Sequence, residues 1–240
     1  MSARPDAPSF LTARPFAHRG LHGARVSENG MAAFSAAIAG HFGIECDVRL
    51  SRDGVAIVFH DATLQRMAGA AGAVCDHDAT TIDRLTLPDG GTVPRLRDLL
   101  HICGTDVPLL IEIKVEGRHV APICAAVAEE LERRPKALAA VMSFNPMAVR
   151  WFTRHRSDVV RGLVVTERNR RGWRARIGRA LALWAAKPDF IACDIRDLPS
   201  PLSTRLRQRG TPVLTWTVRS EEERAQAALH ADQIIFEAAA

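Results

Sequence analysis

Short apolar segments recur eight times along the chain, and most of them are separated by an amphipathic helix. The eight segments predicted as strands are residues 15–19, 44–50, 108–114, 138–144, 160–166, 189–195, 212–218 and 231–237. Strands that are apolar over nearly their whole length and lie between helices are typical of a parallel sheet. Eight such units in 240 residues predict an α/β protein with a (β/α)8 barrel, the TIM barrel.

A doubly wound open sheet is the alternative arrangement. It predicts a Gly-rich phosphate-binding loop after the first strand. Residues 18–23 read HRGLHG, which lacks the GxGxxG spacing, so the barrel is favoured. We expect residues 1–240 to form a single domain, with a small insertion over residues 62–106 that holds one or two short helices.

One additional strand, residues 55–60, follows the second barrel strand after the turn sequence SRDG (51–54). A parallel crossover needs a dozen or more residues, so this strand is expected to return antiparallel in a β-hairpin.

The register of this hairpin decides which side chains meet. Pairing Leu50 with Val55 would put His60 opposite Glu45, with Asp47 on the same face. Because directly opposite residues point to the same side of a sheet, two carboxylates and a histidine are expected to converge.

Polar side chains gather where the predicted strands end. In a barrel of this kind, catalytic groups lie at the C-terminal ends of the strands. The polar or aromatic residues at these ends are His18, Arg19, Glu45, Asp47, His60, Asp61, Glu112, Lys114, Ser143, Asp194 and Trp216. So many polar groups inside an expected core indicate a functional site.

Three of these residues are carboxylates that would repel one another unless a cation joined them: Glu45, Asp47 and Glu112. Oxygen ligands select hard ions, so one divalent cation, Mg²⁺ or Ca²⁺, is expected.

The remaining charged groups indicate acid–base chemistry on an anion. His18 and His60 have a side chain suited to general base and general acid roles. Arg19 and Lys114 supply positive charge for an anion such as a phosphate. Together with the metal, these groups point to cleavage of a phosphodiester.

The same residues resemble a known family. The stretches AHRG (17–20), ENG (28–30), ECD (45–47), DG (53–54), HD (60–61), VPRLRDLL (93–100) and IEIK (111–114) are similar to the glycerophosphodiester phosphodiesterase family pattern of HRG, ENT, ExD, DG, HD, a Pro-Leu helix and ExK. Similarity is strong over residues 17–114 and extends to MSF (142–144) and TWTV (215–218).

The resemblance implies metal-dependent hydrolysis of glycerophosphodiesters to glycerol 3-phosphate and an alcohol, on a (β/α)8 barrel. By similarity, the metal ligands would be Glu45, Asp47 and Glu112. By similarity to the related phosphatidylinositol phospholipases C, His18 would be the base and His60 the acid. Arg19 and Lys114 would hold the phosphate, and Trp216 would line the alcohol pocket.

Two departures from the family pattern stand out. ENT is ENG here, a change expected to touch only the start of the following helix, which Asn29 can cap. The family's closing DGIITDxP is DQIIFEAAA here, so Glu237 is the candidate replacement for its aspartate.

Several alternatives stay open. The substrate could be lipid, through a lysophospholipase D-type activity or a lyase that releases a cyclic phosphate, or the barrel could be a non-catalytic binding protein. Glu112 and Lys114 could be a simple ion pair, and Trp216 could fill the core. Cys46 is expected to pack in the core, while Asp194 has no assigned role.

The basic segment of residues 168–184 is the most individual feature of the chain. Trp173, Ile177, Leu181 and Trp184 recur at helical spacing among several arginines, Arg170 and Arg171 included. One interpretation is a barrel helix with a solvated basic face. The other is peripheral contact with an anionic membrane.

The composition of the chain limits the expected class of binding partner and the expected cellular location. The net charge is +5, yet there is no lysine-rich tail and no helix-turn-helix or zinc-finger pattern, so a small-molecule phosphodiester is expected rather than nucleic acid. The five cysteines form no CxxC pair, which favours a reducing compartment. No apolar signal-peptide region and no bilayer-spanning run is present, so a cytoplasmic location is expected.

Overall fold

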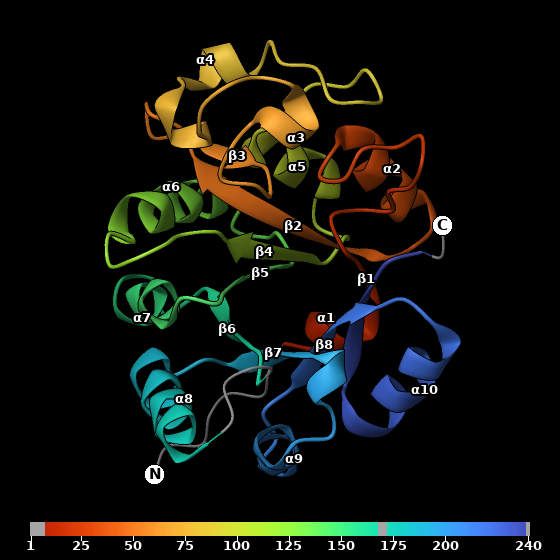
Figure 1. The fold of residues 1–240 in the computed structure, drawn as a ribbon, viewed down its shortest axis with the longest axis vertical. Helices are drawn as coiled ribbons and strands as arrows, with labels where there is room; N and C mark the ends of the chain where they lie inside the picture. The colour runs from red at the N-terminus through yellow and green to blue at the C-terminus, as the bar shows by residue number, and fades with distance from the viewer. Residues whose placement is uncertain (1–7, 168–171, 239–240) are drawn as a thin grey trace.

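A closed ring of eight parallel strands forms the centre of the computed structural model, which describes residues 8–167 and 172–238 (Figure 1). The strands are β1 (Phe16–Ala17), β2 (Gly43–Leu50), β4 (Leu109–Ile113), β5 (Ala139–Ser143), β6 (Val160–Val165), β7 (Phe190–Asp194), β8 (Val213–Val218) and β9 (Gln233–Phe236). Each pairs with its neighbours in chain order, and β1 pairs with both β2 and β9, which closes the barrel. The predicted (β/α)8 barrel is confirmed.

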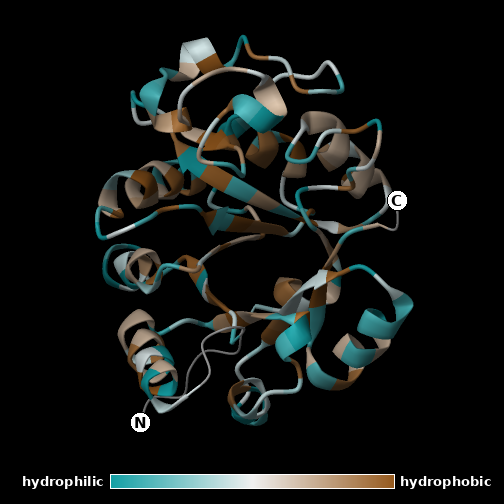
Figure 2. Cartoon of the chain, viewed as in Figure 1, coloured by the Kyte–Doolittle hydropathy of each residue, from teal (hydrophilic) through white to brown (hydrophobic). Residues whose placement is uncertain are grey.

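Helices surround this ring. They are α2 (Met31–Ala39), α5 (Leu96–Cys103), α6 (Ala121–Glu132), α7 (Pro146–His155), α8 (Trp173–Ala186), α9 (Pro201–Gln208) and α10 (Glu221–His230). Their starts follow ordinary capping chemistry: Asn145 accepts a hydrogen bond from Met147 N at α7, and Ser220 accepts one from Glu223 N at α10. Brown apolar residues on the strands and on the inner sides of several helices mark the core between the two layers (Figure 2).

The barrel interior is filled rather than hollow. Large and small residues alternate on neighbouring strands: a Cβ on Gly162 would lie 2.3 Å from the ring of Phe190. The short helix α1 (Phe10–Ala13) packs Leu11, which is fully buried, into the same apolar cluster as Phe16. The N-terminal end of the barrel is therefore closed, which leaves the C-terminal rim for the polar site.

The hairpin forms, but its register is one residue away from the prediction. Strand β3 (Ala56–Val58) runs antiparallel to β2 with Val48 opposite Val58 and Leu50 opposite Ala56. Gly54 has φ +83° and closes a three-residue loop in which Ser51 N donates to Val55 O. The prediction paired Leu50 with Val55 across a four-residue loop. The observed loop shifts the pairing by one residue, so His60 does not lie opposite Glu45.

The insertion over residues 62–106 has a small core of its own. It contains α3 (Gln65–Ala68), a 3₁₀ turn η1 (Val74–Asp76) and α4 (Ala79–Ile82) before α5, which is more helical turns than predicted. Buried Ile57 and Phe59 from the hairpin pack beneath it against Leu64, Val74 and Ile82. The insertion lies over the hairpin at the top of Figure 1.

None of the helices in the described part of the chain is both long enough and apolar enough to cross a bilayer.

Candidate active site

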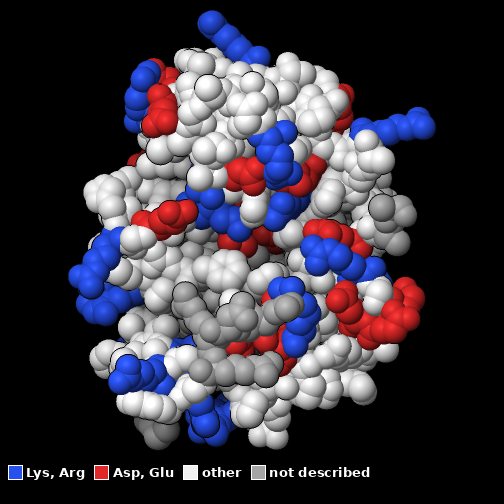
Figure 3. Space-filling view, in the orientation of Figure 1, with Lys and Arg blue, Asp and Glu red and all other residues white. Residues whose placement is uncertain are grey.

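One cavity at the C-terminal rim brings together most of the residues predicted from the sequence. It has a volume of about 280 Å³, and its lining includes His18, Arg19, Glu45, His60, Glu112, Lys114 and Trp216. The parallel register of β2 and β4 places Asp47 beside Glu112, and Lys114 contacts both carboxylates. Figure 3, viewed onto one face of the molecule, shows basic and acidic side chains gathered near the centre of that face.

The three carboxylates form a buried acidic cluster. Glu45 and Asp47 are fully buried and Glu112 is nearly so, and one oxygen from each lies within 4.8 Å of the others. Burial raises the pKa of Glu45 well above its usual value, and repulsion from Asp47 and Glu112 adds to this. Burial also raises the pKa of Glu112 to about 6, although Lys114 opposes the shift.

Two cations partly neutralise this cluster. Lys114 Nζ lies 3.0 Å from Asp47 Oδ1 and 2.5 Å from Glu112 Oε1. Arg19 Nε lies 3.1 Å from Asp47 Oδ2. Burial by itself would raise the pKa of Asp47, but Lys114 and Arg19 outweigh it and lower that pKa, so Asp47 is ionised. Glu112 and Lys114 are thus part of a larger ion network rather than an isolated pair.

The donor set fits a hard divalent cation. Glu45 Oε2 accepts a hydrogen bond of 3.0 Å from the backbone N of Arg19. Glu45 Oε1 is buried and accepts no hydrogen bond from any described residue. An oxygen buried without a partner is costly. Three converging carboxylates with such an oxygen are the donors that Mg²⁺ or Ca²⁺ uses.

His18 is held by a carboxylate from the far end of the chain. Its Nδ1 lies 2.7 Å from Glu237 Oε1, and its Nε2 lies 3.9 Å from Glu45 Oε2. Burial lowers the pKa of His18 below 6.5, although the hydrogen bond to Glu237 opposes this. Hydrogen bonds from His18 and Arg219 hold the pKa of Glu237 at about 2, so this carboxylate is ionised.

His60 has a matching arrangement. Its Nδ1 lies 2.7 Å from Asp61 Oδ1, and Arg66 Nε donates to Asp61 Oδ2 at 2.6 Å. Arg49 Nε donates to the backbone carbonyl of His60 at 2.7 Å, which fixes the segment beyond β3. Burial lowers the pKa of His60, although Asp47 and Asp61 oppose the shift. This loop, and not a ladder pair with Glu45, brings His60 to the rim.

The ENG segment reaches the site, contrary to the prediction that it affects only a helix start. Gly30, not Asn29, is the N-cap of α2. Asn29 has φ +55° and is buried, and its Nδ2 donates to Asp47 Oδ2 at 2.9 Å while its Oδ1 accepts from Asp47 N at 3.2 Å. Glu28 accepts hydrogen bonds from both Arg19 and Arg66. The position of ENG in the family pattern was the one sequence signal for these roles.

Two aromatic rings form one wall of the cavity. Trp216 and Phe144 meet edge to face with ring centroids 5.4 Å apart, and Lys114 Nζ lies 5.9 Å from the Phe144 centroid. Trp216 Nε1 donates to Ala192 O, and the ring is partly exposed, so it both packs and faces the cavity. Phe144 was missed as a site residue because it directly follows its strand as an ordinary apolar residue.

Two of the sequence candidates, Ser143 and Asp194, have structural roles, and Cys46 is a core residue. Ser143 Oγ donates to Ile113 O at 2.8 Å and accepts from Asn145 N. Asp194 accepts a hydrogen bond from Arg196 N and starts a short 3₁₀ turn, η2 (Ile195–Asp197). Cys46 packs in the core between strands and helices, as predicted.

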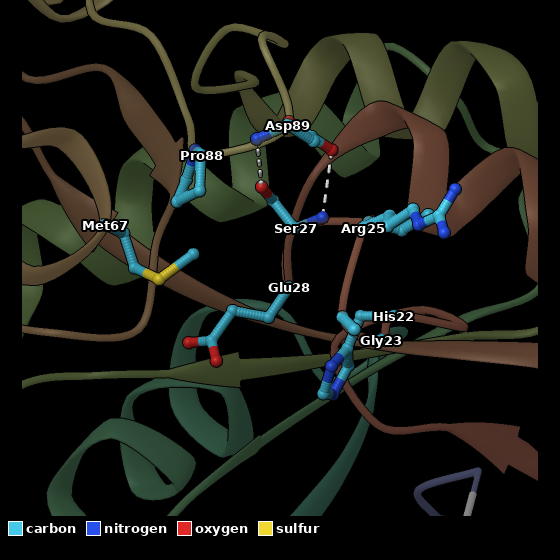
Figure 4. Close-up of a pocket in the computed structure, with 10 residues that line it drawn as sticks. His22, Gly23, Arg25, Ser27, Glu28, Met67, Pro88 and Asp89 are labelled. Atoms are coloured by element: carbon cyan, nitrogen blue, oxygen red, sulfur yellow. Dashed lines mark hydrogen bonds between the residues drawn. The ribbon is translucent and has the colours of Figure 1, made fainter. Parts of the chain in front are cut away.

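A second cavity, of about 420 Å³, lies between the loop of residues 22–28 and the insertion (Figure 4). Ser27 N donates to Asp89 Oδ2 at 2.9 Å, and Asp89 N donates to Ser27 Oγ at 3.2 Å. These bonds tie the insertion to the loop that follows β1. Glu28 lines this cavity and also contacts Arg19, and Arg66 of the insertion binds both Glu28 and Asp61, so the insertion supports the rim cavity.

Comparisons with known proteins agree with this geometry. Residues 18–238 match the model of the Glycerophosphoryl diester phosphodiesterase family. The chain is 41% identical over 99 residues to the protein named "Probable glycerophosphodiester phosphodiesterase 2" from Mycobacterium tuberculosis, an alignment covering 41% of this chain and 37% of that protein.

Two other comparisons extend over nearly the whole chain. The protein named "Probable glycerophosphodiester phosphodiesterase 1", also from Mycobacterium tuberculosis, is 28% identical over 90% of this chain and 86% of its own length. A solved phosphodiesterase from Oleispira antarctica, in complex with the product sn-glycerol-3-phosphate, has a TM-score of 0.79 and 21% identity, covering 95% of this chain and 93% of that one. At this identity the structural likeness supports the fold.

Proposed function

Since the chain belongs to the Glycerophosphoryl diester phosphodiesterase family, we propose that it hydrolyses glycerophosphodiesters to glycerol 3-phosphate and an alcohol. The observation that carries the proposal is the convergence of two histidines, three carboxylates and two cations on one rim cavity. The glycerol 3-phosphate product named for the Oleispira antarctica protein supports the same chemistry. We also propose that residues 1–240 work as one domain, with residues 62–106 as an insertion in it.

Glu45, Asp47 and Glu112 would hold one divalent cation, Mg²⁺ or Ca²⁺. The unpartnered Oε1 of Glu45 supports this role, as does the charge balance, in which Lys114 and Arg19 leave one of the three carboxylates without a cation when all are ionised. When bound, the ion supplies positive charge next to the phosphoryl oxygens and acidifies a nearby hydroxyl group.

Arg19 and Lys114 would bind the phosphate. Both line the cavity and both carry a positive charge that faces Asp47, so an entering phosphate would exchange contacts with that carboxylate. Trp216 and Phe144 form an apolar wall beside Lys114, suited to the alcohol part of the substrate.

The histidines divide the proton transfers. In each of them a carboxylate accepts the Nδ1 hydrogen, which leaves Nε2 to exchange a proton with the substrate. His18 removes the proton of the attacking hydroxyl as its oxygen bonds to phosphorus, and His60 protonates the alkoxide as the bond from phosphorus to the leaving oxygen breaks. The attacking hydroxyl belongs to water or to the glycerol part of the substrate, and in the second case a cyclic phosphate is formed first.

Assays on a panel of glycerophosphodiesters test this function. We expect release of glycerol 3-phosphate that stops with EDTA and returns with Mg²⁺ or Ca²⁺. His18→Ala and His60→Ala should each lower kcat by at least about 10², whereas His155→Ala, an exposed histidine on α7, should not. Turnover that resists EDTA and survives both substitutions would refute the mechanism, and phosphorus NMR would detect a cyclic product.

A lysophospholipase D-type activity is the second candidate. The observation that favours it is the apolar wall of Phe144 and Trp216, since Phe144 is 45% exposed at the rim. Comparing turnover of lysophosphatidylcholine with turnover of glycerophosphocholine separates the two activities.

A further inference from the structure

Helix α8 turns its largest apolar side chains to the solvent. Trp173, Ile177, Leu181 and Trp184 recur every three or four residues, so they form one stripe along the helix. Their exposed fractions are 67%, 51%, 59% and 73%, respectively. An amphipathic barrel helix normally buries such a stripe against the strands, so this pattern is inverted.

The inner side of α8 contributes two alanines and one leucine to the core. Ala186 is the one buried residue of the helix, and Ala182 and Leu183 are partly buried against the core. Arg179 is directed to the inner side as well, where its Nη2 lies 3.4 Å from Glu167 Oε2. The large apolar stripe therefore contributes little to packing within this chain.

Positive charge borders the stripe on both sides. Arg174 follows Trp173 and Arg176 precedes Ile177, and both arginines are exposed. Residues Trp173–Ala186 include no Asp or Glu. Figure 3 shows blue side chains beside uncharged surface over α8. Three other arginines of the basic segment of residues 168–184, Arg168, Arg170 and Arg171, lie outside the described residues.

A groove of about 410 Å³ continues this surface between α7 and α8. Its floor includes Met147 and Trp151 from α7 and Ala182 from α8, and Arg150 and Arg154 lie among its lining residues. Figure 1 places α7 and α8 side by side at the lower left of the barrel. The groove lining that the structure describes includes three arginines and no Asp or Glu, so this apolar surface is complementary to an anionic amphiphile.

We infer that α8 is an interfacial helix that docks the protein on an anionic lipid bilayer. Trp and aliphatic side chains would enter the boundary between headgroups and acyl chains, and Arg174 and Arg176 would stay with the lipid phosphates. Because α8 follows β6, its N-terminal end with Trp173 lies on the rim side of the barrel. Docking therefore brings the rim cavity close to the lipid surface, whatever reaction the cavity performs.

Vesicle sedimentation tests the inference. The full chain should bind mixed phosphatidylcholine and phosphatidylglycerol vesicles, bind less at high salt, and bind pure phosphatidylcholine weakly. Trp173→Ser/Trp184→Ser should lower the partition coefficient by at least about tenfold. The matched control is Leu229→Ser on α10, since Leu229 is 70% exposed on another side of the barrel and should not matter.

A charge variant keeps the test decisive if the tryptophan variant does not fold. Arg174→Gln/Arg176→Gln should weaken binding to the anionic vesicles by about thirtyfold, since each basic residue near such a surface contributes about 1 kcal/mol, or about fivefold. Arg84→Gln/Arg97→Gln changes the net charge equally at two exposed arginines of the insertion and should leave binding unchanged.

Three results would overturn the inference. The first is absence of binding to anionic vesicles, and the second is equal loss of binding in the control variants. The third is a dimer in sedimentation velocity that the tryptophan variant abolishes while vesicles bind neither form, which would make the stripe a contact between copies. Turnover of soluble glycerophosphocholine, measured in parallel, should be the same in all these variants, so failure of docking is distinguishable from failure of the proposed activity.

Discussion

Glu237 accepts a hydrogen bond from His18 although the two lie 219 positions apart in the chain. Closure of the barrel brings them together, because β1 and β9 are neighbours and His18 N also donates to Phe236 O. Glu237 therefore orients the His18 ring so that Nε2 faces the acidic cluster. Arg219 binds the same carboxylate through Nε at 2.6 Å and holds it in place.

Replacing Glu237 should move the pH profile in a defined direction. The hydrogen bond from His18 to Glu237 raises the pKa of His18, while burial lowers it below 6.5. In Glu237→Gln the raising contribution is lost, so the acidic limb of kcat/KM should move to lower pH. Glu221→Gln, on an exposed carboxylate of α10, is the control. An unchanged acidic limb would show that His18 is not the group that titrates.

Glu45→Gln should stabilise the protein in EDTA. Burial raises the pKa of Glu45 in the folded protein above 4.5, so folding favours the protonated carboxyl group. The stability that this form contributes is lost as the pH rises from the pKa of the unfolded chain through the pKa of the folded protein. At pH 7 the variant avoids this loss, and thermal unfolding in EDTA should show a gain of about 1 kcal/mol or more. Added Mg²⁺ or Ca²⁺ should raise the Tm of the wild type by more than that of the variant. A lower Tm of the variant in EDTA would contradict this account of the acidic cluster.

Asn29 combines an unusual backbone with two bonds to Asp47. Asn29→Ala loses both bonds and keeps a side chain at φ +55°, so urea unfolding should show a loss of about 2–3 kcal/mol. Asn29→Gly also loses the bonds but adopts this backbone without strain, so it should be the more stable of the two. Both should lower kcat/KM because Asp47 loses its support. Equal stability of the two variants would mean that the backbone conformation carries no cost.

Gly20 lies where the chain after His18 passes close to α2. It has φ +78°, and a Cβ there would lie 2.8 Å from the backbone carbon of Ala33. Gly90 has φ +86° with nothing within 4 Å of a Cβ, so Gly90→Ala should cost about 1 kcal/mol. Gly20→Ala should cost at least about 2 kcal/mol more because backbone must move. Similar unfolding midpoints for the two variants would contradict the close approach.

Phe144 should influence substrate choice more than stability. Its ring is 45% exposed, so Phe144→Ala should change the free energy of unfolding by less than about 1 kcal/mol. The KM should rise for substrates with a bulky alcohol, with kcat changed less. Met147→Ala serves as the control, since Met147 is 40% exposed outside the rim cavity. An equal rise in KM for substrates with small and bulky alcohols would show that Phe144 does not contact the alcohol.

The barrel and the composition of its rim could be predicted from the sequence because both depend on local patterns. The spacing of apolar residues along the sequence distinguishes the strands from the amphipathic helices. The C-terminal ends of the strands in a barrel then lie at one rim. The hairpin register could not be predicted, because it depends on Gly54 adopting φ +83° within a three-residue loop. One residue of register moves every side chain of the strand to the other face.

Other site features depend on contacts between distant residues. Asn29 was expected to cap a helix, a role its side chain commonly fills, and instead it supports Asp47 across the rim. Glu237 was expected only as a replacement in a divergent motif, and its partner became visible once the barrel closed. The outward stripe of α8 follows from rotation of the helix about its axis, which periodicity alone leaves undefined.

The floor formed by α1 has a consequence for turnover. With Leu11 and Phe16 packed across the N-terminal end, reactant and both products must pass through the same mouth. With the alcohol on the aromatic wall, where Phe144 is 45% exposed, glycerol 3-phosphate would be held by the more buried Arg19 and Lys114. The alcohol would then leave first and glycerol 3-phosphate second, so glycerol 3-phosphate is expected to act as a competitive inhibitor.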